Sequence, residues 1–478
     1  MQANYNLQKH PKSLWYMIAI YIWEYFSFYG MRSILILYLL DQLRLGDSTA
    51  YAISGAYITL IYLSPISGGI IADKLLGYKK SVILGSILMS IGHIILGISS
   101  NNQLYLGMAF IICGYGFFKS NISCLLGQQY NSYDPNKDSG FTLLYLGGNL
   151  GSILAPIACG LVAHYYGWHY GFGLAGIGMI FGLIIFMMGS KHIPNVMPEK
   201  NLSKNLENLI LSLSILLIVV VSYLSLEYLI EGYLLSIVTT IAVIYFIYIF
   251  FKVEIIARKS LIKILPFFIF GIIFWIFDEQ MFTSIEVFIH RNVDTYFFGI
   301  NIPASSFTSI NSFSLFLGGL IVAWIWKKLK SLDNDFGRMI KFSFGFIFQL
   351  LCFTLFFQAA KDASIGGTTS ALFVVIALVF LGISELFIDP IALSEVTSIR
   401  DKRYTGFLAA FYMLTTGSVA GFIGAHVANL SSFNDTMNNS DLVSQAVLFK
   451  DLFANIIFIL MVLILLWYIL AFFIRKLK

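Results

Sequence analysis

The sequence predicts an all-α polytopic membrane protein. Of its 478 residues, 58% are hydrophobic and only 12% are charged, whereas soluble proteins carry about 25% charged residues. Apolar segments long enough to cross a bilayer, which takes about 20 residues, recur along the whole chain. The net charge of +5 is spread over short loops between these segments, so it does not indicate nucleic-acid binding.

Fourteen such segments can be delimited, in a six–two–six arrangement. They fall at about residues 14–40, 50–73, 80–98, 103–126, 140–163, 167–189, 209–226, 230–251, 262–289, 305–327, 338–358, 370–392, 404–429 and 450–474. Two six-helix bundles are typical of transporters built from repeats. We predict an N-terminal six-helix bundle (1–190), a linker with two additional transmembrane helices (191–258) and a C-terminal six-helix bundle (259–478).

The distribution of basic residues predicts the orientation of the chain. Of the 30 Lys and Arg residues, Arg32 and Lys119 lie inside spans, and the others fall mainly on the side that carries both termini. Four lie on the opposite side: Arg44, Arg291, Lys361 and Lys450. Because basic loops stay in the cytoplasm, we expect both termini there, with the first span as an uncleaved anchor. An even number of spans agrees with this orientation.

The first span, Leu14–Leu40, contains two ionisable residues, Glu24 and Arg32. Such a group costs about 2.5–3.5 kcal/mol at the bilayer centre on insertion scales, so it usually faces protein or a water-filled cavity. Helical spacing places the side chains of Tyr21, Tyr25 and Arg32 on one stripe. We interpret this stripe as the cavity-facing side of a transport helix. The alternative is an ion pair that only fixes helix packing.

The loop between the second and third spans, GGIIADKLLGYKK (Gly68–Lys80), resembles the loop signature of the major facilitator superfamily. Gly69, Asp73, Gly77 and Lys80 stand at its motif positions. Asp73 is expected to cap the following turn. The resemblance implies the superfamily fold, with two six-helix bundles.

A narrower resemblance begins in the first span. WEYFSFYGMR (Trp23–Arg32) is similar to the E-x-x-E-R-F-x-Y-Y-G-M-R stretch of the proton-dependent oligopeptide transporter family. Further stretches resemble the fifth, sixth, seventh and tenth spans of that family: DSGFTLLYLGGNLGSILAPI, GWHYGF, EQMFTSIEVFIHRNVD and GISELFIDPIALSEVT. The resemblance extends over roughly residues 10–430. It implies secondary active transport, with proton-coupled symport of di- and tripeptides by alternating access.

The resemblance also implies roles for individual residues. Lys119 is the only cation of the fourth span and needs a carboxylate partner, for which Glu24 is the natural choice. Proton coupling is expected to involve Glu24, Lys119, Glu279 and Glu385. Substrate binding is expected to involve Arg32, Tyr29, Tyr62, Lys119, Asn149, Asn311, Glu385 and Phe411.

Chemistry supports several of these assignments. The amides of Asn149 and Asn311 can bond both the donor and the acceptor of a peptide group. A buried carboxylate such as Glu385 suits the ammonium end of a peptide. Of the adjacent acids Asp278 and Glu279, only one can readily face a cavity; we favour Glu279, with Glu286 seven residues on along the same stripe. Asp389 stands where relatives usually have serine, and its role is open.

Three positions depart from the family motif, and at one of them Phe28 replaces a tyrosine. Tyr21 replaces its first glutamate and Tyr25 replaces its arginine. The first change removes a proton carrier, and the second removes a cation that relatives use for the substrate carboxylate. Arg32 and Lys119 are left to hold that carboxylate. The substitutions therefore leave open an uncoupled or altered-coupling transporter of a non-peptide or modified substrate.

Other classes fit the sequence less well. A receptor that kept the fold without transport would have no use for costly buried charges. We expect no enzymatic activity, because neither nucleophile motifs nor metal-ligand pairs at helical spacing occur, and we expect no cofactor or metal.

The four cysteines of the chain lie in apolar segments and are expected to be buried free thiols. The expected protein is a multi-pass monomer of the bacterial cytoplasmic (inner) membrane, whose partners are peptide, protons and lipid.

Overall fold

The computed structural model describes the chain except for residues 1–9, 99–102, 131–133, 135, 195, 197–202, 298, 329–334, 398, 400, 434–441 and 477–478. Its contacts divide into two compact units. Unit 1 comprises Met1–Ile34 and Leu60–Tyr228, and unit 2 comprises Leu35–Thr59 and Leu229–Lys478. The boundaries within the first two helices fall at Leu35 and Leu60, so each of these helices contributes residues to both units.

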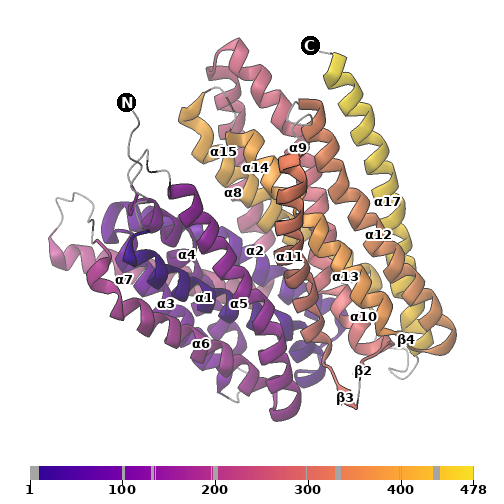
Figure 1. The fold of residues 1–478 in the computed structure, drawn as a ribbon. Helices are drawn as coiled ribbons and strands as arrows, with labels where there is room; N and C mark the ends of the chain where they lie inside the picture. Colours follow the sequence, from indigo (N-terminus) through magenta and orange to yellow (C-terminus); the bar gives the residue numbers. More distant parts are fainter. Residues whose placement is uncertain are drawn as a thin grey trace. The chain divides into compact units, whose positions relative to one another are not determined.

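The described residues up to 228 are mainly helical (Figure 1), because a backbone in lipid must satisfy its polar groups within its own segment. Its helices are α1 (Lys12–Leu37), α2 (Asp47–Ile71), α3 (Tyr78–Gly97), α4 (Leu104–Gly127), α5 (Lys137–Tyr166), α6 (Trp168–Met188) and α7 (Lys204–Tyr228). The π-helical turns Tyr38–Gln42 and Ala72–Leu76 extend α1 and α2, and a 3₁₀ turn, Ser190–His192, follows α6.

Unit 2 contains further helices, several of them interrupted. They are α8 (Glu231–Lys252), α9 (Ile255–Asp278), α10 (Ser284–Asn292), α11 (Thr308–Lys328), α12 (Asp335–Gly366), α13 (Ala371–Glu385), α14 (Asp389–Thr397), α15 (Thr405–Met413), α16 (Ala420–Ala428) and α17 (Leu442–Lys476). 3₁₀ turns lie at Glu279–Phe282, Ala304–Phe307, Lys402–Tyr404 and Asn429–Ser431, and a π-helical turn joins α15 to α16 at Leu414–Val419.

Four two-residue strands lie at one end of these helices. β1 (Val293–Asp294) pairs in parallel with β4 (Thr369–Ser370), in the register Val293 opposite Thr369. β2 (Tyr296–Phe297) pairs antiparallel with β3 (Ile300–Asn301). The sequence analysis did not predict these strands. The pairing of β1 with β4 joins the end of α10 to the connection between α12 and α13.

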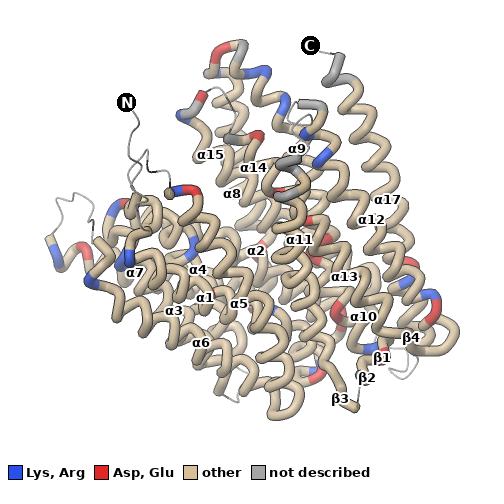
Figure 2. The backbone as a smooth tube through the Cα atoms, viewed as in Figure 1, with Lys and Arg blue, Asp and Glu red and all other residues tan. Residues whose placement is uncertain are grey.

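Thirteen helical segments of the described residues are long and apolar enough to cross a membrane. α1 is not among them, because its tyrosines, Glu24 and Arg32 lower its hydropathy. Its 26 residues extend about 39 Å at 1.5 Å per residue, which exceeds the bilayer core of about 30 Å. With α1 included, the spans number fourteen. Charged residues concentrate towards the helix ends in both units (Figure 2).

Close helix packing in unit 1 depends on glycine. A Cβ added to Gly85 on α3 would lie 2.5 Å from the backbone oxygen of Gly114 on α4, and one added to Gly114 would lie 2.6 Å from that of Gly85. Small residues let helix backbones approach in this way. The two helices that follow α6 pack against different neighbours: α7 packs against α4, and α8 packs against α9. The predicted division into two bundles and a linking pair stays a prediction.

The loop signature after α2 differs from our expectation at Asp73. The residue before α3 is Gly77, with φ 72° and ψ 160°, and no side chain caps this helix. The chain continues through a π-helical turn as far as Leu76, so Asp73 lies too early to cap α3. The expected cap is therefore wrong, and Asp73 instead hydrogen-bonds Tyr78. Lys79 donates to two carbonyls beyond the end of α6, those of Ser190 and Ile193.

The cysteines are free thiols, but one of them is not buried. Cys113, Cys159 and Cys352 are buried, as expected, whereas Cys124 is exposed. That part of the prediction is wrong, because an apolar segment in a membrane helix has an outer face as well as a packed one. Periodicity of polar residues is too weak in α4 to distinguish these faces.

A bidentate ion pair joins the start of α2 to the end of α10 within unit 2. The guanidinium of Arg291 donates to both carboxylate oxygens of Asp47, at 2.8 and 2.7 Å. The backbone N–H of Phe433 also donates to Asp47 at 3.1 Å. The side chains of Arg291 and Asp47 are 20% and 5% exposed.

We predict that Arg291→Ala destabilises the protein by about 3–5 kcal/mol, because it leaves the buried Asp47 carboxylate without its cation. Thermal unfolding of the detergent-purified protein measures this as a lower Tm. Arg403→Ala is the matched control: its pair with Asp401 is exposed, so its Tm should be unchanged. Equal Tm values for the two variants would contradict the prediction.

Candidate functional site

Glu24 of α1 and Lys119 of α4 form an ion pair inside unit 1. The Nζ of Lys119 lies 3.3 Å from Oε2 of Glu24, and the Glu24 side chain is fully buried. Arg32, two turns further along α1, lies over the ring of Phe28 at 5.9 Å. The expected pairing of Glu24 with Lys119 is thus confirmed as a contact. Its role in proton coupling stays a prediction.

Three tyrosine rings surround the ammonium of Lys119. Its Nζ lies 3.9 Å from the ring centroid of Tyr25, 4.8 Å from that of Tyr21 and 5.4 Å from that of Tyr115. The hydroxyls of Tyr21 and Tyr25 lie 3.3 Å apart. The face of an aromatic ring attracts a cation within about 6 Å. We call these three residues the tyrosine cage; the two that depart from the family motif, Tyr21 and Tyr25, form most of it.

Glycines of α5 explain how this cage fits beside α1. A Cβ on Gly151 would lie 2.2 Å from the backbone oxygen of Ile22, and one on Gly148 would lie 3.0–3.1 Å from the rings of Tyr21 and Tyr25. The two helices therefore contact each other closely along the stretch GGNLG. Asn149 follows Gly148, and its amide donates to the carbonyl of Tyr145 at 3.0 Å.

Other predicted binding residues of unit 1 extend from the cage. Tyr29 is half-buried, and its ring lies 5.6 Å from that of Tyr25. The half-buried Tyr62 of α2 meets the ring of Tyr115 edge-on at 6.5 Å. These contacts place aromatic side chains from α1, α2 and α4 in one continuous cluster with Lys119.

In unit 2, Asn311 of α11 donates to Oε1 of Glu385 at 2.7 Å. Glu385 is the last residue of α13 and is half-buried. A Cβ on Gly382 would lie 2.3 Å from the backbone oxygen of Asn311, so the two helices are in close contact here. The structure thus brings together two residues that the sequence analysis predicted separately as binding residues.

Asp389, whose role was open, holds three helices together. Its Oδ1 accepts hydrogen bonds from the indole of Trp275 on α9 at 2.9 Å and from the hydroxyl of Tyr412 on α15 at 2.7 Å. The sequence analysis missed both donors, because they are far from Asp389 along the chain. No spacing rule links such residues.

The acids of the seventh span lie where its helix is interrupted. Asp278 ends α9, and Glu279 begins a 3₁₀ turn that leads to Thr283, whose φ of −134° and ψ of −104° are not helical. Both acids are buried, so burial does not single out Glu279. The expectation that Glu286 continues the stripe of Glu279 is wrong, because the break resets the helical phase.

Phe411 packs within a cluster of rings of unit 2. It stacks on Phe246 of α8 at 5.7 Å and on Phe407 at 5.8 Å, and Phe268 lies 5.9 Å away. Phe246 belongs to the additional pair of helices. Phe411 therefore fixes α8 against α15, and its role as a wall of the binding site stays a prediction.

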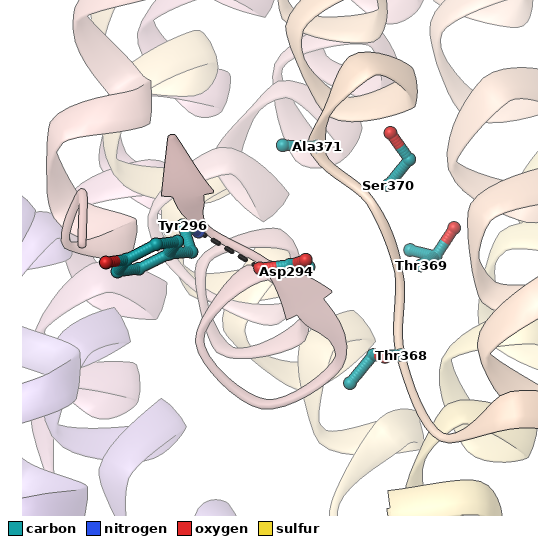
Figure 3. Close-up of a pocket in the computed structure, with 6 residues that line it drawn as sticks. All are labelled: Asp294, Tyr296, Thr368, Thr369, Ser370 and Ala371. Atoms are coloured by element: carbon teal, nitrogen blue, oxygen red, sulfur yellow. Dashed lines mark hydrogen bonds between the residues drawn. The ribbon is translucent and has the colours of Figure 1, made fainter. Parts of the chain in front are cut away.

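A polar cavity of about 340 Å³ lies beside the short strands (Figure 3). Asp294 and Tyr296 line one side of it, and residues 368–371 line the other. The carboxylate of Asp294 accepts the backbone N–H of Tyr296 at 3.1 Å. None of the predicted binding residues lines this cavity, and in the described part of the chain no cluster of three potential metal ligands occurs.

Comparison with known proteins gives this geometry its context. The model of the POT family matches residues 79–443, which is most of the chain. The chain belongs to the POT family. It is 32% identical over 439 residues to the uncharacterized transporter YclF of Bacillus subtilis, a match that covers 88% of each chain. It is 30% identical over 451 residues to the peptide transporter YePEPT of Yersinia enterocolitica, covering 87% of this chain and 88% of that one.

Solved structures of POT transporters resemble this fold over almost its whole length. A crystal structure of the peptide transporter POT in complex with sulfate matches with a TM-score of 0.81 and 27% identity, covering 98% of this chain and 96% of that one. Tetrameric PepTSo2 matches with a TM-score of 0.83 at 24% identity, over 98% and 99% of the chains. The predicted major facilitator fold, multi-pass membrane insertion and transporter class are confirmed, and the relatives are transporters rather than enzymes.

We predict that the tyrosine cage stabilises Lys119 through its ring faces. Tyr25→Phe keeps the ring and loses the hydroxyl contact with Tyr21, whereas Tyr25→Leu loses the face. A desolvated cation–π contact contributes about 2 kcal/mol. Tyr25→Leu should therefore unfold at a clearly lower temperature than the matched Tyr25→Phe. If the two variants unfold together, the rings do not hold the ammonium.

Proposed function

We propose that this POT family member is a proton-coupled symporter of di- and tripeptides that works by alternating access. The observation that carries the proposal is the ion pair of the buried Glu24 with Lys119. Two similar relatives support the substrate class, because their names describe peptide transport: YePEPT, and dipeptide and tripeptide permease B of Xenorhabdus bovienii, which is 29% identical over 438 residues.

The coupling follows from charge balance. Ionised Glu24 neutralises Lys119 in an environment where an unpaired charge is expensive. A proton on Glu24 removes that balance and leaves the ammonium with ring faces alone. The carboxylate of a peptide then supplies the missing anion. Proton and substrate therefore favour each other's binding, which is the requirement for symport.

The other end of the substrate requires an anion. Glu385 is half-buried and accepts a hydrogen bond from Asn311, and its carboxylate is the group of opposite charge to a peptide ammonium. We propose that Lys119 and Arg32 contact the substrate carboxylate and that Glu385 contacts its ammonium. Asn149 and Asn311 would bond the peptide group, with Tyr29, Tyr62 and Phe411 as apolar contacts and Glu279 as a further proton site.

The same proposal includes the cellular setting. Basic residues concentrate on the side of both termini, which supports a cytoplasmic location for the termini and insertion into the bacterial inner membrane. We propose a monomer as the working unit, since both units belong to one chain. Light scattering of the purified protein distinguishes a monomer from a tetramer such as that of the similar structure PepTSo2.

A second candidate is a transporter with weakened coupling. It rests on the tyrosine cage, which offers Lys119 partners that protonation of Glu24 does not remove. The stronger the ring contacts, the less the ammonium requires a substrate anion. If the ring contacts alone satisfied the ammonium of Lys119, exchange of substrate would be independent of pH.

We predict that reconstituted vesicles accumulate labelled dialanine when an inward proton gradient is imposed. Glu24→Gln should abolish this accumulation and retain exchange down a peptide gradient, because the amide cannot carry the proton. Glu254→Gln, at an exposed position, is the control and should behave as wild type.

Absence of peptide flux under every gradient would refute peptide transport. Proton-driven accumulation by Glu24→Gln would refute the role of Glu24, and pH-independent exchange by the wild type would establish the second candidate.

We further predict that dialanine raises the Tm of the wild type and not that of Glu385→Gln, since a ligand stabilises the state it binds. N-acetyl-dialanine lacks the ammonium and should raise neither. Single amino acids and nitrate test the alternative substrates in the same assay. An equal Tm shift with the acetylated peptide would show that Glu385 does not bind an amine.

A further inference from the structure

A second cavity lies in unit 2, where α8 meets α2 and α16, away from every residue assigned a role above. Its volume is about 480 Å³, within the usual range of small-molecule pockets. Glu231 and Ser236 of α8 line it together with His426 of α16, and apolar groups, among them Ala52, Phe422 and Ala425, form other parts of the wall.

Glu231 is the acid of this cavity, and among the described residues His426 is the one titratable cation that interacts with its carboxylate. The residue is only 5% exposed. Its carboxylate accepts its own backbone N–H, but the buried Oε2 has no hydrogen-bond partner among the described residues. A buried carboxylate oxygen of this kind destabilises the folded protein if nothing donates to it. It therefore points to a donor, and to a cationic one, since the carboxylate carries the charge.

Two other polar side chains of the cavity, those of His426 and Ser236, can also accept a hydrogen bond. Nδ1 of His426 lies 2.9 Å from the carbonyl oxygen of Phe422. Because a carbonyl oxygen only accepts, Nδ1 carries the hydrogen in the neutral ring. The lone pair that can accept a hydrogen bond is therefore on Nε2. The hydroxyl of Ser236 donates to the carbonyl of Gly232 at 2.7 Å, so its oxygen can accept. One charged and two neutral acceptors thus line one cavity.

We propose that this cavity binds a primary ammonium group. An ammonium has three N–H donors and one positive charge, which match these three acceptors and the single carboxylate. The apolar wall suits the carbon atoms attached to the nitrogen. A metal ion fits less well, because the described residues hold no group of three His, Cys, Asp or Glu ligands. The ammonium can belong to the headgroup of an aminophospholipid or to a soluble amine.

The test uses the full-length protein at pH 8 and compares amines that differ only in their N–H donors. Ethanolamine should raise the Tm, whereas choline, which has the same charge and no N–H donor, should not. In nanodiscs, phosphatidylethanolamine should raise the Tm relative to phosphatidylcholine if the lipid is the source. A shift with ethanolamine and none with phosphatidylethanolamine assigns the site to a soluble amine.

Glu231→Gln should weaken ethanolamine binding about tenfold or more, because it removes the charged partner of the bond. Glu227→Gln, an exposed acid four residues earlier, is the matched control and should bind as wild type. Without ligand, Glu231→Gln should unfold no earlier than wild type, which shows that the variant is folded. Equal shifts with ethanolamine and choline, no shift with either amine source, or full binding by Glu231→Gln would each overturn the proposal.

Discussion

The structure of unit 1 depends on the cost of placing charge inside a membrane protein. Glu24 is fully buried, and a carboxylate in such a place loses several kcal/mol of hydration that only a well-placed cation restores. Lys119 provides that cation from another helix, 3.3 Å away. The glycines of α5 allow α1 to pack closely while it carries two large tyrosines towards Lys119. Helix packing and charge balance are thus two aspects of one requirement.

The same requirement explains several contacts of unit 2. Asp47 receives a guanidinium and a backbone N–H, Asp389 receives an indole and a phenol, and Glu385 receives the amide of Asn311. In these contacts both donors to Asp389 are neutral groups. They hold α9, α14 and α15 together without a positively charged partner. Glu231 differs from these acids, because its Oε2 has no donor in the described part of the protein. That difference is what gives its cavity the character of a ligand site.

Sequence alone could predict the helices, because length and hydropathy are local properties of a span. It could also predict the contact of Glu24 with Lys119, since each is a rare charge in an apolar segment and needs the opposite sign. The break between α13 and α14 could be predicted from Pro390, which follows the first residue of α14. The interruption at Glu279–Thr283 could not, because no proline or glycine marks it in the sequence. The donors to Asp389 come from residues 114 and 23 positions away, for which sequence spacing carries no signal. The packing of Phe411 against Phe246 of α8 could not be predicted either, because the two residues are far apart along the chain.

The tyrosines at positions 21 and 25 set an upper limit on coupling through Glu24. Coupling between proton and substrate equals the difference in substrate binding between the two protonation states of Glu24. When Glu24 is neutral, the ring faces are the partners left to the ammonium of Lys119, so in that state they lower the free energy that a substrate carboxylate can recover. If the rings stabilise the ammonium by about 2 kcal/mol more with Glu24 neutral than with Glu24 ionised, the coupling falls more than tenfold, because 1.4 kcal/mol corresponds to a factor of ten. A chain that keeps Glu24 and Lys119 can therefore remain proton-coupled while accumulating substrate less steeply than relatives with the intact motif.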